Sequence, residues 1–199
     1  MNKKKINRLT MIVILAVFVI LAGRISVKNL VVRGLYPSLP RPIAKEVVLI
    51  TSAGQSTDTY MIKDIANKLM IHNFFMPQAN KSDLEDINSV IVVVGYSGIG
   101  EKLHKISFQD EKIRASKLLE AAIEKNLPII TIHLGGDLRM DDKSYELLEL
   151  TAEKSDYIIA LISSNTNNQL SDLAKELDIP LTLVKSVKDI SEPFASVFR

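Results

Sequence analysis

Short apolar runs alternate with longer amphipathic stretches along the chain from Val47 onward. The apolar runs are continuous rather than alternating, which is typical of strands buried on both faces of a sheet. A weaker run at residues 74–76 is cut by Pro77 and is therefore expected at a sheet edge. The predicted buried strands cover residues 47–50, 90–94, 129–134, 157–162 and 181–184.

The stretches between these strands repeat apolar residues every three or four positions, which predicts helices. Strands that alternate with helices form parallel sheets through right-handed crossovers. We therefore predict an α/β fold, a three-layer doubly wound, mostly parallel sheet of five to six strands. The expected strand order is the flavodoxin-like 2-1-3-4-5 with the last strand added at the edge, and the alternative is 3-2-1-4-5-6. The predicted helices cover residues 58–70, 110–125, 143–152 and 168–177, with a single turn at 82–87.

A separate hydrophobic pattern lies at the start of the chain. Residues 9–23 are uncharged, and basic residues precede them. A helix of this length spans about 22 Å, which is short for a bilayer core of roughly 30 Å unless flanking residues contribute. Residues 20–22 make a poor signal-peptidase site because a bulky residue stands where a small one is preferred. We favour an uncleaved signal anchor over a cleaved signal peptide. Either one predicts a domain outside the cytoplasm.

Three parts of the chain are predicted from these patterns. Residues 1–23 form the signal anchor or signal peptide, residues 24–46 form a tether that contains three prolines, and residues 47–199 form the α/β domain. Prolines at this density do not continue a helix or donate to a strand ladder. The predicted contact with the membrane is made by residues 9–23.

The charge distribution and the composition exclude several functions. The net charge is +2, but residues 1–44 carry only basic charges, so the remainder is net negative. A nucleic-acid binder needs a basic face, so we expect no nucleic-acid partner. The chain contains no cysteine, which excludes thiolate catalysis, disulfides and Cys-ligated zinc. The histidines and carboxylates do not fall at metal-ligand spacing, and we expect no metal site.

Small and polar residues follow four of the predicted strands where each strand ends. Ligands of open parallel sheets bind outside the carboxyl ends of the strands, near the switch in strand order. We therefore expect the four loops to form one pocket rich in hydrogen-bond donors. In any single loop, the small and polar residues are also explained by the needs of a tight turn or a helix N-cap. The candidate ligand-binding residues are Ser52, Gly54, Gln55, Ser56, Thr57, Gly95, Tyr96, Ser97, His133, Gly135, Gly136, Ser163 and Asn165.

Two enzymatic alternatives stay open on the same fold. The loop at residues 51–57 resembles the flavodoxin phosphate loop, and Tyr96 lies where flavodoxins place a ring against the flavin, so FMN is a candidate cofactor. Ser97 follows a strand, as hydrolase nucleophiles do, and His133 and Asp137 are the residues that would act as base and orienting acid. The apolar run around His133 nevertheless favours a hydrogen-bonded histidine near the core.

The segment LITSAGQSTD, the strand in DLEDINSVIVVVG, the Gly-Gly loop after TIHL and the final IPLTLV strand resemble an uncharacterised, domain-of-unknown-function family of exported bacterial α/β proteins. The resemblance covers most of residues 47–189, and the SAGQS loop at residues 52–56 is its most specific part. It implies export and a single α/β domain, and it implies no activity.

These observations together predict a membrane-tethered or secreted extracytoplasmic domain. We expect it to bind a small polar or anionic ligand at the strand C-terminal edge, as an accessory to a transporter or envelope partner, without chemistry of its own. The alternative is an enzyme on the same fold, either a Ser97-based hydrolase or a flavin-binding protein.

Overall fold

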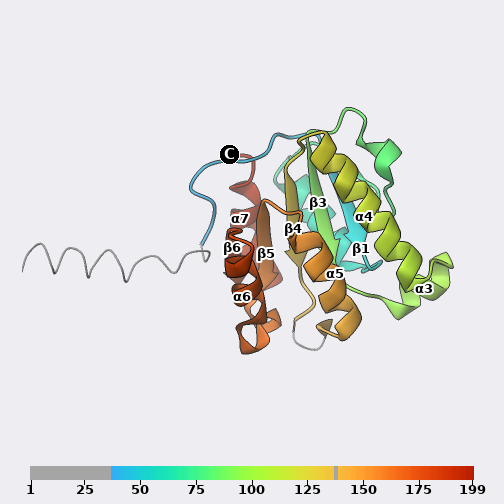
Figure 1. The fold of residues 1–199 in the computed structure, drawn as a ribbon. Helices are drawn as coiled ribbons and strands as arrows, with labels where there is room; N and C mark the ends of the chain where they lie inside the picture. The colour runs from blue at the N-terminus through green and yellow to red at the C-terminus, as the bar shows by residue number, and fades with distance from the viewer. Residues whose placement is uncertain (1–36, 137–138) are drawn as a thin grey trace, which may run out of the picture. The chain divides into compact units, whose positions relative to one another are not determined.

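The computed structural model describes residues 37–136 and 139–199 (Figure 1). The predicted hydrophobic helix at residues 9–23 and the first part of the predicted tether lie outside the described residues. Within the described ranges, the structure contains no helix with the length and apolar character needed to span a bilayer. The described residues form one compact unit.

A six-stranded parallel sheet forms the centre of this unit, with the strand order β2-β1-β3-β4-β5-β6. This order is the flavodoxin-like one that the strand and helix pattern predicts, and β2 lies at an edge as expected from Pro77. Every residue of β1, β3 and β4 is buried, which explains why their sequences are mostly apolar on both faces. The strands are β1 (Val48–Ala53), β2 (Asn73–Phe75), β3 (Ser89–Val94), β4 (Ile129–His133), β5 (Tyr157–Leu161) and β6 (Leu181–Val184).

Helices cover both faces of the sheet, so the predicted three-layer arrangement is confirmed. One core lies between the sheet and α4, α5 and α6, and the other lies between the sheet and α2 and α7. Figure 1 shows α4 and α5 crossing the near face of the sheet. The helices are α2 (Asp58–Lys68), α3 (Gly98–His104), α4 (Phe108–Glu124), α5 (Asp142–Ala152), α6 (Gln169–Glu176) and α7 (Ser191–Ala195), with a 3-10 turn at Lys81–Leu84.

Two short helices were not predicted from the sequence. In α3 only Gly100 is buried, so this helix has no apolar stripe facing a core, although Ser97 caps it by accepting a hydrogen bond from the Gly100 amide. The last helix, α7, has five residues, which is too few to show a helical period. Strand β1 is also longer than expected because its polar residues Thr51 and Ser52 are buried within the sheet.

Part of the predicted tether belongs to the folded unit. Leu39 and Ala44 are buried in the same core as α7. The amides of Ile43 and Ala44 both donate to the carbonyl of Val197 at 3.0 Å, and the Leu39 amide donates to Ser196 Oγ. The folded unit therefore begins before Val47.

Candidate functional site

A pocket of about 680 Å³ lies at the carboxyl ends of β1, β2 and β3. The chain leaves β1 and β3 in opposite directions along the sheet, so the pocket lies at the switch in strand order where ligands of this fold bind. Its walls come from the loops after these three strands, from the first turn of α2 and from α3. The lining residues are Gln55, Ser56, Thr57, Tyr60, Met76, Pro77, Gln78, Ala79, Asp83, Ser97, Ile99, Gly100, Leu103 and His104.

Apolar side chains that are open to solvent surround this pocket. Ile99 and Leu103 of α3 are 82% and 74% exposed, and Tyr60 and Met76 face them from α2 and from the end of β2 with 55% and 39% exposure. Among the described lining residues there is no lysine or arginine, and Asp83 is the single carboxylate. The site is therefore mainly apolar and carries no fixed positive charge.

The loop after β1 has an unusual backbone that brings it close to the loop after β3. Gly54 and Gln55 both have left-handed backbone angles, with φ values of 100° and 65°. A side chain at Gly54 would place its Cβ 2.4 Å from the carbonyl oxygen of Gly95, so only glycine fits there. Gln55 forms an isolated bridge to Tyr96, which fastens the two loops together.

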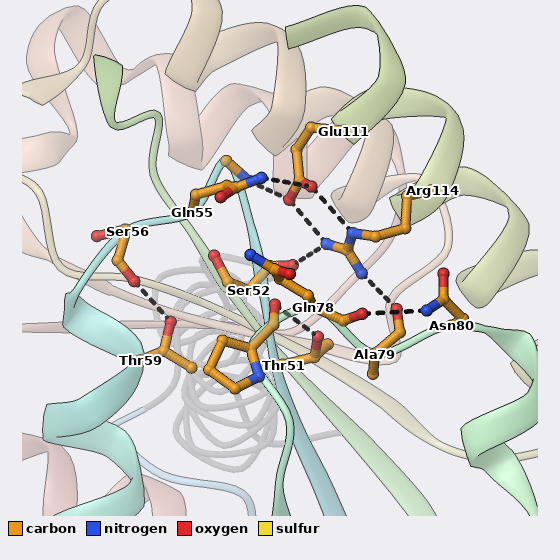
Figure 2. A network of polar contacts seen from close by, with 12 residues as sticks. Thr51, Ser52, Gln55, Ser56, Thr59, Gln78, Ala79, Asn80, Glu111 and Arg114 are labelled. Carbon is orange, nitrogen blue, oxygen red and sulfur yellow. Dashed lines mark hydrogen bonds and ion pairs between the residues drawn. The ribbon is translucent and has the colours of Figure 1, made fainter. Parts of the chain in front are cut away.

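A buried ion pair from α4 holds the loops on both sides of the pocket (Figure 2). The Glu111 carboxylate accepts the Gly54 amide at 2.9 Å and the Gln55 side-chain amide at 3.3 Å. Arg114 donates to Glu111 at 2.7 Å, to the Ser52 carbonyl and to the carbonyl of Ala79 in the loop after β2. One charge pair therefore fixes two pocket walls relative to α4.

The ion pair also determines how the Gln55 side chain is oriented. An ionised carboxylate only accepts hydrogen bonds, so the Gln55 Nε2 must face Glu111 and Oε1 must face away from it. Oε1 is shielded from bulk solvent, and no described residue donates a hydrogen bond to it. Figure 2 shows the side chains of Gln55, Ser52 and Gln78 gathered beside the ion pair. The Ser52 hydroxyl is likewise buried without a partner among the described residues.

Side chains of the protein itself compensate the partial positive charge at the N-terminus of α2. Ser56 Oγ accepts a hydrogen bond from the Asp58 amide at 3.1 Å, and the Thr59 hydroxyl donates to the Ser56 carbonyl at 2.8 Å. The buried Asp58 carboxylate lies in the first turn and accepts hydrogen bonds from Arg139 at 2.8 Å. A carboxylate at this position opposes the binding of a second anion at the helix N-terminus.

Tyr96 and Ser97 have structural partners in the loop after β3. The Tyr96 ring packs edge-on against Phe108 at 5.6 Å, its hydroxyl donates to Glu101, and Lys143 lies 4.2 Å above the ring centroid. The hydrogen bond from Lys143 to Tyr96 raises the pKa of Lys143. Tyr96 is fixed by these contacts and does not line the pocket. Ser97 does line the pocket, and it also caps α3.

His133 is a hydrogen-bonded core residue, as the apolar run around it indicates. Its Nδ1 lies 2.9 Å from the Val94 carbonyl, and its Nε2 is buried with no partner among the described residues. Burial lowers the pKa of His133 below 6.5, although the hydrogen bond with the Val94 carbonyl and, to a smaller extent, nearby Asp58 oppose this effect. The orienting acid of the hydrolase hypothesis, Asp137, lies outside the described residues.

None of the described residues in the loops after β4 and β5 lines this pocket, so it draws on two of the four loops that the sequence analysis expects to form the site. A Cβ at Gly135 would lie 2.9 Å from the His133 ring, and Gly136 has a φ of 63° and faces Ser163, which is exposed. Asn165 bonds Ser171 through both side-chain atoms and so orders the start of α6. Of the expected residues, the pocket brings together Gln55, Ser56, Thr57 and Ser97.

Sequence reasoning missed the pocket walls contributed by α3 and by the loop after β2. Met76, Pro77 and Gln78 follow a strand that is weak in the sequence, so the sequence pattern does not predict that their loop joins the site. Ile99 and Leu103 lie in a segment for which the sequence analysis predicts no helix. Their four-residue spacing was the available signal, since it places two apolar side chains on one helix face.

The fold and the pocket define an α/β domain with flavodoxin-like strand order and a candidate ligand site at its switch point. Residues 45–198 match the family described as Domain of unknown function (DUF6305), and the chain belongs to this family. The resemblance to an uncharacterised family that the sequence suggests is thereby confirmed.

Other comparisons add little to this assignment. No curated protein matches the chain. A G-D-S-L family protein from Desulfitobacterium hafniense DCB-2 is 13% identical, with a TM-score of 0.34 over 76% of this chain and 95% of that one. AlinE4, an SGNH-hydrolase family esterase, is 12% identical, with a TM-score of 0.31 over 72% of this chain and 77% of that one. Similarity at this level supports no functional argument.

Proposed function

We propose that this domain binds a small, mainly apolar ligand in the pocket at the carboxyl ends of β1, β2 and β3, without chemistry of its own. The observation that carries the proposal is the group of exposed apolar side chains around the pocket, with Ile99 and Leu103 of α3 the most exposed. Exposed apolar surface next to a concave site is typical of ligand-binding grooves. The volume of about 680 Å³ is in the range of small-molecule sites.

The lining favours this ligand over the polar or anionic one expected from the sequence. An anion would find no lysine or arginine among the described lining residues. The start of α2, which lines the pocket through Ser56 and Thr57, already carries the buried Asp58 carboxylate. A bound anion would lose its hydration without gaining a charged partner, which is unfavourable.

We further propose that the domain works outside the cytoplasm, as an accessory to a transporter or envelope partner. The support is the uncharged stretch at residues 9–23 preceded by Lys3, Lys4, Lys5 and Arg8, which suits a signal anchor. If the segment is cleaved, the domain is secreted. Protease added to intact cells should digest an anchored domain, and mass spectrometry of the mature N-terminus distinguishes anchor from signal peptide. Full protection from protease in intact cells, together with an intact N-terminus, would contradict export.

The binding proposal is tested by hydrogen–deuterium exchange on the full chain in nanodiscs of zwitterionic lipid. N-phenylnaphthylamine, an apolar probe, should slow amide exchange in residues 76–79 and 97–104, because it would cover both pocket walls. Exchange in α6, which lies away from the pocket, should not change. The local readout separates pocket binding from partition of the probe into lipid.

Matched variants sharpen this test. Ile99→Glu combined with Leu103→Glu should abolish the protection, because charges would replace the apolar rim. Met70→Glu is the control, since Met70 is 84% exposed, similar to Ile99, and does not line the pocket. The proposal fails if the probe gives no protection, or if the double variant is protected as well as the natural chain.

A further inference from the structure

We propose that helix α3 docks on an anionic bilayer surface, so that the pocket beside it opens at the membrane. This inference rests on the proposed function, because the proposed anchor holds the domain beside a bilayer and the proposed ligand is apolar. It names the partner that covers the outer face of α3.

The exposure of the apolar side chains on α3 is the first reason. Ile99 and Leu103 are 82% and 74% exposed, although both line the pocket. A ligand held in the pocket covers only the part of each side chain that lines it, so most of this apolar surface is left in water. Contact with a bilayer interface removes such surface from water, which is favourable.

The charges on the outer face of α3 are the second reason. Lys102 and Lys105 are exposed next to these apolar side chains. The carboxylate of Glu101 is half-buried instead, since it accepts a hydrogen bond from the Tyr96 hydroxyl and lies 3.8 Å from Lys143 Nζ. The helix therefore presents apolar and basic side chains on a domain that is net negative as a whole. Anionic headgroups attract a face of this kind.

The way in which α3 is attached to the domain is the third reason. Gly100 is the residue of α3 that is buried, and a Cβ there would lie 2.8 Å from the carbonyl oxygen of Gln55. The helix therefore lies directly against the turn after β1, and the Ser97 cap fixes its first turn. Because a glycine faces the domain, the long side chains of the helix are held on the outside.

The chain that precedes the folded unit is long enough for this contact. The described chain begins beside the C-terminus, where the Ile43 amide donates to the Val197 carbonyl at 3.0 Å. Figure 1 shows α3 and the C-terminus on opposite sides of the folded unit. A unit of this size is about 40 Å across. Residues 24–36 can extend to about 45 Å, so a domain anchored through residues 9–23 can lay α3 on the same bilayer.

A fluorescent label on α3 tests the docking. The chain has no cysteine, so Ile99→Cys gives the full chain a single thiol for a nitrobenzoxadiazole label. The labelled chain is reconstituted in vesicles of phosphatidylcholine and phosphatidylglycerol that carry a nitroxide on their acyl chains. A label that enters the bilayer is quenched, so we expect a loss of emission at position 99. Met70→Cys is the control, since Met70 is 84% exposed and precedes β2, at the other end of the strands.

Replacement of the lysines tests the electrostatic part. Lys102→Gln with Lys105→Gln should lower the ratio of docked to undocked chain about fivefold for each lysine, because a basic residue near an anionic surface contributes about that factor. Vesicles of phosphatidylcholine alone should cause a similar loss. Lys45→Gln with Lys68→Gln removes the same charge from exposed positions at the other end of the strands and should leave the quenching unchanged.

Quenching at position 70 that equals or exceeds the quenching at position 99 would overturn the inference. A blue-shifted emission at position 99 without lipid quenching would overturn it as well, because a second copy or another protein would then cover α3. In both cases the binding function stands if N-phenylnaphthylamine still protects residues 76–79. If the lipid quenches the label but the probe gives no protection, the docking stands and the proposed binding function fails.

Discussion

Glu111 is the residue on which the geometry of the pocket depends most. Its two carboxylate oxygens accept hydrogen bonds from the Gly54 amide, from Gln55 Nε2 and from Nε and Nη2 of Arg114. The side chains of Glu111 and Arg114 are 3% and 10% exposed, so both charges are removed from water. A buried charge pair is tolerated when such bonds satisfy it, and removing one partner leaves the other uncompensated.

We therefore expect Glu111→Ala to lower the free energy of unfolding by about 3–5 kcal/mol. Urea denaturation of the natural chain and the variant measures the change. Glu124→Ala, at an exposed position at the end of the same helix, should change stability by less than about 0.5 kcal/mol. Equal effects of the two substitutions would show that the buried pair does not hold the loops.

A second prediction at this scale concerns His133. Burial lowers its pKa below 6.5 in the folded chain, so the unfolded chain binds a proton more readily. Stability should fall as the pH drops below about 6.5, by no more than about 1.4 kcal/mol per pH unit for one group. The difference in unfolding free energy between the natural chain and His133→Gln, measured between about pH 7.5 and pH 5.5, isolates this contribution. A difference that does not vary with pH would contradict the assignment.

At the scale of elements, the turn from β1 into α2 sets the shape of the site. The backbone of this turn lies against the loop after β3, where the Ser97 amide donates to the Gly54 carbonyl at 2.8 Å and the Gly95 amide donates to Ala53. Helix α3, which follows, is held by its cap and contributes mainly exposed apolar side chains. The turn is therefore the rigid wall of the pocket, and α3 is the more weakly packed one.

Two glycines at this site should respond differently to alanine. In Gly54→Ala the new Cβ would overlap the Gly95 carbonyl and require a left-handed backbone, so we expect a loss of at least about 2 kcal/mol. In Gly98→Ala the nearest atom lies 3.5 Å away, and stability should change by less than about 0.5 kcal/mol. Thermal denaturation of both variants tests the contrast, which would be absent if the two loops were not in close contact.

At the scale of the whole molecule, the folded unit reaches further toward the N-terminus than the strand pattern suggests. Leu39 and Ala44 complete the core under α7, and the backbone of residues 43–44 bonds to Val197. The two ends of the folded unit therefore support each other. The first residues of the described chain are a structural part of the domain and are not a free spacer.

A fragment of residues 47–199 should consequently be less stable than a fragment of residues 34–199. Loss of the buried Leu39 alone corresponds to about 1.5–3 kcal/mol, to which the lost hydrogen bonds add. Urea unfolding of both fragments measures the difference, and Leu39→Ala in the longer fragment should account for a large part of it. Identical unfolding midpoints would show that this segment does not stabilise the core.

The sequence predicts the sheet far better than it predicts the site. Strands buried on both faces must be apolar, so their runs, their order and the edge position of β2 follow from the pattern of residues. The pocket depends on features without such a pattern. Gln55 bonds Glu111, and Arg114 bonds the Ser52 carbonyl, across more than fifty residues of sequence. Helix α3 exposes Ile99 and Leu103, whereas a helix that can be predicted from its apolar stripe buries that stripe. The predicted loops after β4 and β5 follow real strands, but they lie on the wrong side of the switch point for this pocket.

The clamp formed by Glu111 and Arg114 bears on how this fold could change its specificity. Its bonds to Ser52, Gly54 and Ala79 all end on backbone atoms, so they do not depend on which side chains those loops carry. Lining residues such as Met76, Ile99 and Leu103 take no part in the clamp. The lining of this domain can therefore be exchanged while the frame keeps its shape, which makes the pocket suitable for redesign toward chosen small molecules.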